Sequence, residues 1–393
     1  MTQSQAVPAA AAGGYDVAAL RQAEFPWADE AIFLNHAGIG PLPERARRGM
    51  EGYLRDRAAA YRITDEHLFQ VFERSRSLVS RLINADPGEI ALATNTSYGI
   101  NVAALALPLA PGDVVIASHG EFPANVFPWR QLAGKGVALE LVPTDPDGWP
   151  DENRLMERMA DPRVKVLAIS LVQFHSGYLA DLDRLSRVAR ATETWLVVDA
   201  IQGLGQVPFD VRATPVDILA CGAQKWLLSP WGSGFTYVRR ELIERLEPPL
   251  AGWTAFEGTD DFSTLLAYPG EWRRDARRFE LITLPFQDFY GMNLSLDLLL
   301  ELGIGSIRDH LRAIREPIVA WAARRGVGIG SPLDRRASGM VCLRLPDPAP
   351  VFAALTERGV VASLREGLIR LSPHCYNTEA EMAQVADWLD ELV

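Results

Sequence analysis

The sequence predicts an α/β fold, with a large domain built on a mostly parallel sheet and a smaller α+β domain after it. From about Ala31, short and nearly continuous apolar runs alternate with helical segments. That pattern is typical of strands buried on both faces of a parallel sheet. After about residue 285, long amphipathic helices are followed by short strands. The length of 393 residues also exceeds what one core usually organises.

The individual elements follow from the position of each run. Strands are predicted at residues 89–94, 113–118, 138–143, 164–172, 194–200 and 216–221. Helices are predicted between them, including 98–109, 123–134, 151–160 and 181–192. The C-terminal part is predicted to hold helices at 286–303 and 304–325, strands at 339–345 and 368–372, and a last helix at 378–392. Ligands of open α/β sheets collect beyond the carboxyl ends of the strands, so the residues there are the candidates for a site.

Composition limits the class of protein. Apolar residues make up 48% and charged residues 23%, as in ordinary globular chains, and the net charge of -11 argues against a nucleic-acid or anionic-membrane binder. The three cysteines lie far apart without a CxxC pair, and the histidines show no paired spacing, so neither a disulfide framework nor a metal site is predicted. No apolar run is long enough to span a bilayer. We expect a cytoplasmic protein without nucleic-acid or membrane partners.

Lysine is rare in this chain. Only three of the 39 basic residues are lysines, at positions 135, 165 and 225. Since arginine is used wherever a general positive charge will do, each lysine raises the question of whether a primary amine is required. Lys135 lies in a glycine turn and Lys165 opens a strand, whereas Lys225 follows the end of the run 216–221.

Three predicted strands end at or just before polar residues that are able to bind or react with a ligand. Thr96 and Ser97 open a helix after the run 89–94, where hydroxyls and free amides bind phosphate or, alternatively, only cap the helix. Asp199 ends the run 194–200, although Asp199 and Gln202 also have the spacing of a helix capping box. Lys225 is suited to form a Schiff base with a carbonyl cofactor. A phosphate site, a carboxylate for a pyridinium nitrogen and an imine-forming lysine are together the attachments that pyridoxal 5'-phosphate needs.

The order of these motifs resembles the class V aminotransferase family of fold-type I pyridoxal-phosphate enzymes, which includes cysteine desulfurases and isopenicillin N epimerase. The resemblance runs through FLNHAGIGPLP (33–43), EFPANVFPW (121–129), VVDAIQG (197–203), GAQKWLLSPWGSG (222–234), RRFELIT (277–283) and IRLSPHCYNTEAEM (369–382). It therefore covers nearly the whole chain.

The resemblance implies a role for each matching residue. Lys225 is the catalytic residue, which forms the internal aldimine and transfers the proton at Cα. Cofactor-binding residues are Thr96, Ser97 and Gln224 for the phosphate, Asp199 for the ring nitrogen, Gln202 for the phenolic oxygen and Phe122 on the ring face. Thr283 is expected to reach the phosphate of the other subunit, so a homodimer with shared active sites is implied.

Arg370 is expected to bind the α-carboxylate of the substrate. In LIRLS the strand period places it on one face with Leu368 and Ser372, so an arginine interrupts an apolar strand; the alternative is an edge charge that faces solvent. Further substrate-binding candidates are Asn35, His36, Gln173 and His175, with Phe174 between the last two.

The chain departs from the family pattern at three informative places, one of which is Phe174, where relatives often have an asparagine. Cysteine desulfurases carry their nucleophilic cysteine shortly upstream of the arginine, and here VVASLREGLIR is short and lacks one, while Cys375 follows Arg370. Phe122 replaces a histidine that many relatives stack on the ring. The expected activity is therefore that of an aminotransferase or C–S β-lyase acting on an α-amino acid through a Cα carbanion, not persulfide transfer. An epimerase and a non-catalytic binding partner are the alternatives, and a nicotinamide enzyme is opposed by the missing GxGxxG fingerprint.

We divide the chain into four parts. Residues 1–14 are expected to form a flexible tail, and residues 15–35 an N-terminal segment that packs with the small domain. Residues 36–284 are expected to form the large cofactor-binding domain, and residues 285–393 the small C-terminal domain.

Overall fold

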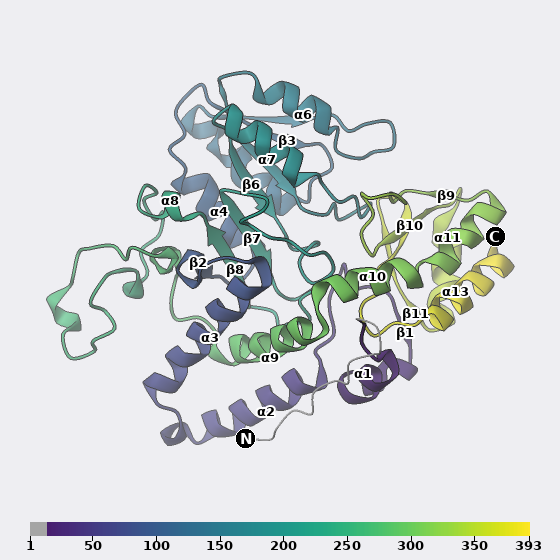
Figure 1. Ribbon diagram of the computed structural model, residues 1–393, viewed down its shortest axis with the longest axis horizontal. Coiled ribbons are helices and arrows are strands. Elements are labelled where there is room, and N and C mark those ends of the chain that lie inside the picture. The colour runs from purple at the N-terminus through teal and green to yellow at the C-terminus, as the bar shows by residue number, and fades with distance from the viewer. Residues whose placement is uncertain (1–13) are drawn as a thin grey trace.

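The central sheet of the protein has seven strands in the order β2-β8-β7-β6-β5-β3-β4 (Figure 1). The structure is a computed structural model that describes residues 14–393. The strands are β2 (Ile90–Leu92), β3 (Val114–Ser118), β4 (Ala138–Val142), β5 (Val164–Ser170), β6 (Trp195–Asp199), β7 (Ile218–Gly222) and β8 (Gly234–Val238). Paired neighbours are parallel except that β8 is antiparallel to both β2 and β7. The predicted α/β fold with a mostly parallel sheet is confirmed.

Helices cover both faces of this sheet, because successive strand residues point to opposite sides. Val197 and Val198 of β6, for example, belong to two different core clusters. One cluster includes residues of α4 (Thr96–Ala106), α5 (Phe127–Arg130) and α8 (Arg240–Ile243). The other includes residues of α3 (Asp65–Ile83), α6 (Glu152–Met159), α7 (Leu182–Ala191) and α9 (Phe286–Leu302). α9 packs against α3 and against α2 (Glu44–Ala58).

Two predicted helices differ from the structure. Residues 123–134 do not form one helix; they hold a 3-10 turn, the short helix α5 and a second 3-10 turn. Pro123 and Pro128 lack the amide donors that a continuous helix needs. The predicted helix 304–325 is two helices, α10 (Ile304–Ile314) and α11 (Glu316–Arg325), and Pro317 lies at the start of the second. Strand β8 was not predicted.

A smaller antiparallel sheet lies in the C-terminal part of the chain. Its strands, in the order β12-β13-β10-β9, are β9 (Gly328–Ile329), β10 (Val341–Arg344), β12 (Ser363–Arg365) and β13 (Leu368–Leu371). They are accompanied by α11, α12 (Pro348–Glu357) and α13 (Glu379–Leu392), on the right of Figure 1. In the described residues, 14–393, we find no helix that is both long and apolar enough to cross a membrane.

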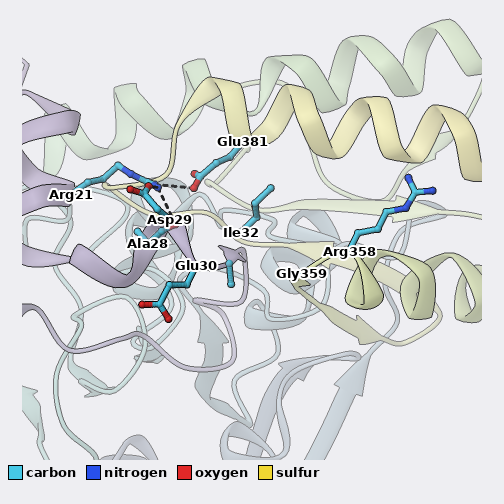
Figure 2. Close-up of a pocket in the computed structure, with 9 residues that line it drawn as sticks. Arg21, Ala28, Asp29, Glu30, Ile32, Arg358, Gly359 and Glu381 are labelled. Atoms are coloured by element: carbon cyan, nitrogen blue, oxygen red, sulfur yellow. Dashed lines mark hydrogen bonds and ion pairs between the residues drawn. The ribbon is translucent and has the colours of Figure 1, made fainter.

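The N-terminal segment contacts the C-terminal part of the chain. β1 (Ile32–Phe33) pairs in parallel with β11 (Val360–Val361). Arg21 of α1 (Val17–Glu24) donates to the carboxylates of Asp29 and Glu381, beside a cavity of about 330 Å³ (Figure 2). The four domain boundaries stay predictions, and residues 1–13 of the expected tail lie outside the described residues.

Candidate active site

Lys225 lies in a turn that follows β7, and two glycines approach the backbone of this turn closely. A Cβ atom on Gly40 would lie 2.0 Å from the carbonyl oxygen of Lys225, and one on Gly205 would lie 2.0 Å from that of Trp226. The amide of Gly40 also donates to the carbonyl oxygen of Gln224 at 2.8 Å. Backbone contacts of this kind exclude any side chain, so segments on both sides hold the turn in place.

The amine of Lys225 is largely withdrawn from water. Within the described residues its Nζ makes no hydrogen bond, and it lies 5.5 Å from the ring centroid of Phe122. The pKa of Lys225 is lowered to about 8, chiefly by burial; the carboxylate of Asp199 opposes this shift and the charge of Arg370 adds to it. An amine with this pKa is partly deprotonated near neutral pH, so it is able to act as a nucleophile or base.

Asp199 is a buried carboxylate at the carboxyl end of β6, with 2% of its surface exposed. Its Oδ1 accepts from the amide of Ile201 at 3.0 Å. Burial raises the pKa of Asp199 to about 7, and the neighbouring charges of Glu121 and Lys225 act in opposite directions. No helix starts after Asp199, because residues 201–206 form turns, so the capping box considered from the sequence is wrong.

Gln202 is buried and already has two partners. Its Nε2 donates to the carbonyl oxygen of Ala37 at 3.0 Å, and its Oε1 accepts from the indole of Trp226 at 2.8 Å. One N–H of the amide therefore remains for a ligand. The predicted contact of Gln202 with a cofactor oxygen stays a prediction.

Thr96, Ser97 and Gln224 come together at the start of α4. Asn95 caps this helix by accepting from the amide of Tyr98, so neither Thr96 nor Ser97 is the cap. Thr96 Oγ1 instead accepts from the buried amide of Gly222 at 2.9 Å. A Cβ on Gly222 would lie 2.6 Å from Oε1 of Gln224 and 3.4 Å from the amide of Thr96. Ser97 is exposed.

A buried carboxylate that the sequence analysis missed, Glu121, lies within electrostatic range of Asp199. Glu121 accepts from the amide and hydroxyl of Ser170, from Gln173 Nε2 and from Asn125 Nδ2, at 2.5 to 3.0 Å. No cation pairs with it among the described residues. Two features of the sequence could have pointed to Glu121 as a site residue. Glu121 stands directly before Phe122, and its partner Ser170 lies at the end of β5. Gln173, predicted to contact substrate, is 1% exposed and is held by this network.

Phe122, Phe174 and His175 form an aromatic group near the lysine. The rings of Phe122 and Phe174 meet edge to face with centroids 5.3 Å apart, and those of Phe174 and His175 do likewise at 5.3 Å. His175 Nε2 lies 3.3 Å from the carbonyl oxygen of Gly148, and its Nδ1 is buried without a partner in the described chain.

Arg370 is 2% exposed, on the inner strand β13. Its Nε donates to Ser363 Oγ at 3.1 Å and its Nη1 to the carbonyl oxygen of Phe174 at 2.5 Å. No carboxylate pairs with it in residues 14–393. Burial lowers the pKa of Arg370 to about 10. The alternative of a solvent-facing edge charge is wrong, since β13 has a paired strand on each side.

Asn35 and His36 lie where the N-terminal segment meets the chain after β13. Asn35 forms a bridge with Ser372, and its Oδ1 is buried without a partner in the described chain. His36 is fully buried; its Nδ1 donates to the carbonyl oxygen of Ser372 at 2.8 Å, and its ring lies 5.0 Å from that of His374. The structure does not bring His36 to an accessible surface, and its predicted substrate contact stays a prediction.

Thr283 is exposed and lies just before α9. It shares no hydrogen bond with the other predicted site residues. Within residues 14–393, no group of three or more histidine, cysteine, aspartate or glutamate side chains is arranged to hold a metal ion.

The strand-end residues fit pyridoxal 5'-phosphate. Asp199 is a buried residue whose Oδ2 accepts no hydrogen bond in the described chain, and Lys225 offers an amine that makes no hydrogen bond there. The start of α4 provides an anion site in which a side chain on Gly222 would collide with Gln224. The arrangement is able to hold a phosphate, a protonated ring nitrogen and a carbonyl carbon at once.

Comparison with known proteins agrees with this chemistry. The family model described as Aminotransferase class-V matches residues 32–385. The uncharacterized aminotransferase YcbU of Bacillus subtilis is 28% identical, over 92% of this chain and 95% of its own. Isopenicillin N epimerase of Streptomyces clavuligerus is 30% identical, over 92% of this chain and 94% of its own.

A solved structure shows the same fold. The cysteine desulfurase of Thermococcus onnurineus NA1 superposes with a TM-score of 0.86 and 23% identity, over 100% of this chain and 99% of that one. At that identity the likeness establishes the fold alone. The family match covers most of the chain, however, and the chain therefore belongs to the class V aminotransferase family of pyridoxal-phosphate enzymes.

Proposed function

We propose that this enzyme acts on an α-amino acid as an aminotransferase or a C–S β-lyase, and that it does not transfer persulfide through a cysteine. The burial of Arg370 is the observation that carries the proposal. A buried guanidinium without an acidic partner in the described chain is costly unless a ligand supplies the charge. Since two of its nitrogens are anchored by Ser363 and Phe174, the remaining one is free to bind a carboxylate.

The other site residues receive roles from their positions. Lys225 would attach pyridoxal phosphate and move the proton at the substrate Cα. Asp199 would hold the ring nitrogen protonated, and Phe122 would cover one ring face. The bound cofactor supplies an electron sink for the electrons left at Cα. Thr96, Ser97 and Gln224 would bind its phosphate, and Gln202 its phenolic oxygen.

The positions of the cysteines support the exclusion of persulfide transfer. Cys221, Cys342 and Cys375 are all buried. Burial raises the pKa of each thiol, which disfavours the reactive thiolate. β12 and β13 are joined by Glu366 and Gly367 alone, so there is no room for a cysteine-bearing loop before Arg370.

Two alternatives remain distinct from this proposal. Amino-acid epimerisation is favoured by the 30% identity to isopenicillin N epimerase, but it would need a second proton donor besides Lys225. Phe122, whose ring centroid lies 5.5 Å from the Nζ atom of Lys225, has no ionisable group. A non-catalytic binding partner would have no need for Lys225, Asp199 and Arg370 in one place.

A homodimer with shared active sites is part of the proposal. The segment between α8 and α9 extends from the body at the left of Figure 1 and exposes large apolar side chains. Leu266 is 82% and Tyr268 78% exposed. Exposed apolar surface of this kind is typical of an interface, and Thr283 follows in the same segment. A cytoplasmic location stays a prediction from the cysteine content.

Labelling of the lysine tests the proposed mechanism. The protein would be loaded with pyridoxal phosphate, reduced with borohydride and digested, and we expect the pyridoxyl mass on Lys225 and not on Lys135 or Lys165. Lys225→Ala should remain folded without the label. A label on another lysine would contradict the assignment.

A product assay with a panel of amino acids, including cysteine and S-substituted cysteines, tests the reaction type. A keto acid with transfer of the amino group, or pyruvate with ammonia and a thiol, supports the proposal. Inversion at Cα without another product would favour the epimerase, and persulfide on a cysteine would overturn the exclusion. A protein that does not take up the cofactor would favour the non-catalytic alternative.

A further inference from the structure

Arg365 lies on the same face of the β12–β13 hairpin as Arg370. The register pairs Ser363 with Arg370 and Arg365 with Leu368. Directly paired residues share a face, and every second residue of a strand returns to it, so Arg365 and Arg370 are diagonal neighbours. Diagonal neighbours lie about 7–8 Å apart, with their Cβ atoms somewhat closer, so two long side chains are able to bind one ligand.

The hairpin turn keeps Arg365 beside the site. Glu366 and Gly367 both have positive φ, 47° and 75°, as in the tight two-residue turns of β-hairpins. No loop therefore separates Arg365 from the strand that carries Arg370. Arg370 is buried and Arg365 is exposed, so the pair runs from the interior of the protein toward solvent.

The charge of Arg365 has no acidic partner among the described residues. In residues 14–393 no carboxylate forms an ion pair with it, and its guanidinium makes one long contact, 3.4 Å to the carbonyl oxygen of Leu364. Its positive charge lowers the pKa of both Lys225 and Arg370, which places it within electrostatic range of the two groups. Arg336, by contrast, pairs with Glu152 and Asp181.

A substrate with one carboxylate would neutralise Arg370 and leave Arg365 without a partner. We propose that the substrate is an α-amino acid whose side chain ends in a second acidic group, and that Arg365 binds this group while Arg370 binds the α-carboxylate. The inference rests on the function proposed above and deepens it, because it names the substrate class. Arg365 is then a specificity residue, which contacts the substrate at a distance from the reacting Cα.

Pairs of isosteric amino acids test this assignment. Glutamate would be compared with glutamine, and aspartate with asparagine, by steady-state kinetics and by titration of the visible spectrum of the cofactor-loaded protein. The variants are Arg365→Gln, Arg365→Lys and, as a control outside this sheet, Arg324→Gln, an exposed arginine in the last turn of α11. The spectral titration gives a dissociation constant that does not depend on turnover.

We expect the wild type to favour the acidic member of a pair at least about tenfold, as for a hydrogen-bonded charge pair. Arg365→Gln should remove this preference by weakening the binding of the acid alone, Arg365→Lys should retain part of the preference, and Arg324→Gln should retain all of it. A wild type that favours the neutral member, or a preference unchanged in Arg365→Gln, overturns the role of Arg365 but not the proposed function. No spectral response to any amino acid overturns both.

Discussion

His374 Nε2 donates to the carbonyl oxygen of Trp226, the residue that follows Lys225, at 2.9 Å. Its Nδ1 accepts from the amide of Cys375 at 2.7 Å, so both ring nitrogens are used by a neutral imidazole. The ring is fully buried. Through this one side chain, the segment after β13 holds the turn that carries the lysine.

The burial of His374 predicts a loss of stability in acid. Burial lowers the pKa of His374 to about 4 from 6.5, so the stabilisation is complete above pH 6.5 and is lost as the pH falls from 6.5 to 4. The full effect is about 3 kcal/mol. Urea unfolding of the cofactor-free protein at pH 7.5 and 4.5 measures it. Because glutamine does not titrate, the unfolding free energy of His374→Gln should depend less on pH than that of the wild type. An equal pH dependence in the two proteins would contradict the role given to His374.

Gly40→Ala should weaken both the fold and cofactor binding. Its Cβ would lie 2.0 Å from the carbonyl oxygen of Lys225, so the backbone of the lysine turn has to shift. We expect a loss of about 2–4 kcal/mol of unfolding free energy, together with weaker retention of pyridoxal phosphate on dialysis. Gly134→Ala is the control, because nothing lies within 4 Å of its Cβ. Similar behaviour of the two variants would argue against the close approach.

Thr96→Ala should cost about 1–3 kcal/mol of stability, because the buried amide of Gly222 loses its acceptor. If Thr96 also binds the phosphate, the dissociation constant of pyridoxal phosphate should rise about tenfold or more. Thr96→Ser keeps the hydroxyl and should resemble the wild type in both measurements. An alanine variant with unchanged cofactor affinity would limit Thr96 to its structural role.

Asp199→Asn should lower turnover while leaving the covalent link to Lys225 intact. An amide does not hold the ring nitrogen protonated, so we expect kcat to fall about a hundredfold or more. Labelling with borohydride should remain at Lys225. Unchanged kcat would remove Asp199 from the mechanism.

The same substitution has a second, independent readout in the cofactor-free protein. The pKa of Asp199 is raised from 3.8 to about 7, so the wild type loses stability as the pH rises through this range. Asp199→Asn does not titrate. Its urea midpoint should exceed that of the wild type at pH 8, by an amount equivalent to about 4 kcal/mol at most, and the gain should disappear near pH 4.

The proposed dimer predicts a concentration-dependent mass. Sedimentation should give twice the chain mass for the wild type, and Leu266→Ser with Tyr268→Ser should shift it toward the monomer. Tyr61→Ser, at a residue that is 84% exposed between α2 and α3, is the matched control. A monomeric wild type that turns over amino acids would refute the shared site.

The sequence alone predicted most strands of the central sheet, but it did not predict where the helices break. The apolar runs identified six strands of the central sheet. All but the partly exposed edge strand β4 are largely buried, and strands buried on both faces need continuous apolar residues. The helix predicted at 123–134 failed at its two prolines, and β8 was missed because it contains Gly234 and Thr236 and pairs antiparallel beside the parallel strands.

The sequence by itself determined which functional groups stand at the strand ends: Lys225 after β7, Asp199 on β6 and Thr96 after β2. These positions follow from local periodicity. Only the tertiary structure decided what each group touches. The network of Glu121 depends on segments far apart in the chain, and so do the partners of Gln202 and the contacts of Arg370. Such contacts arise when separate layers pack, and no local pattern encodes them.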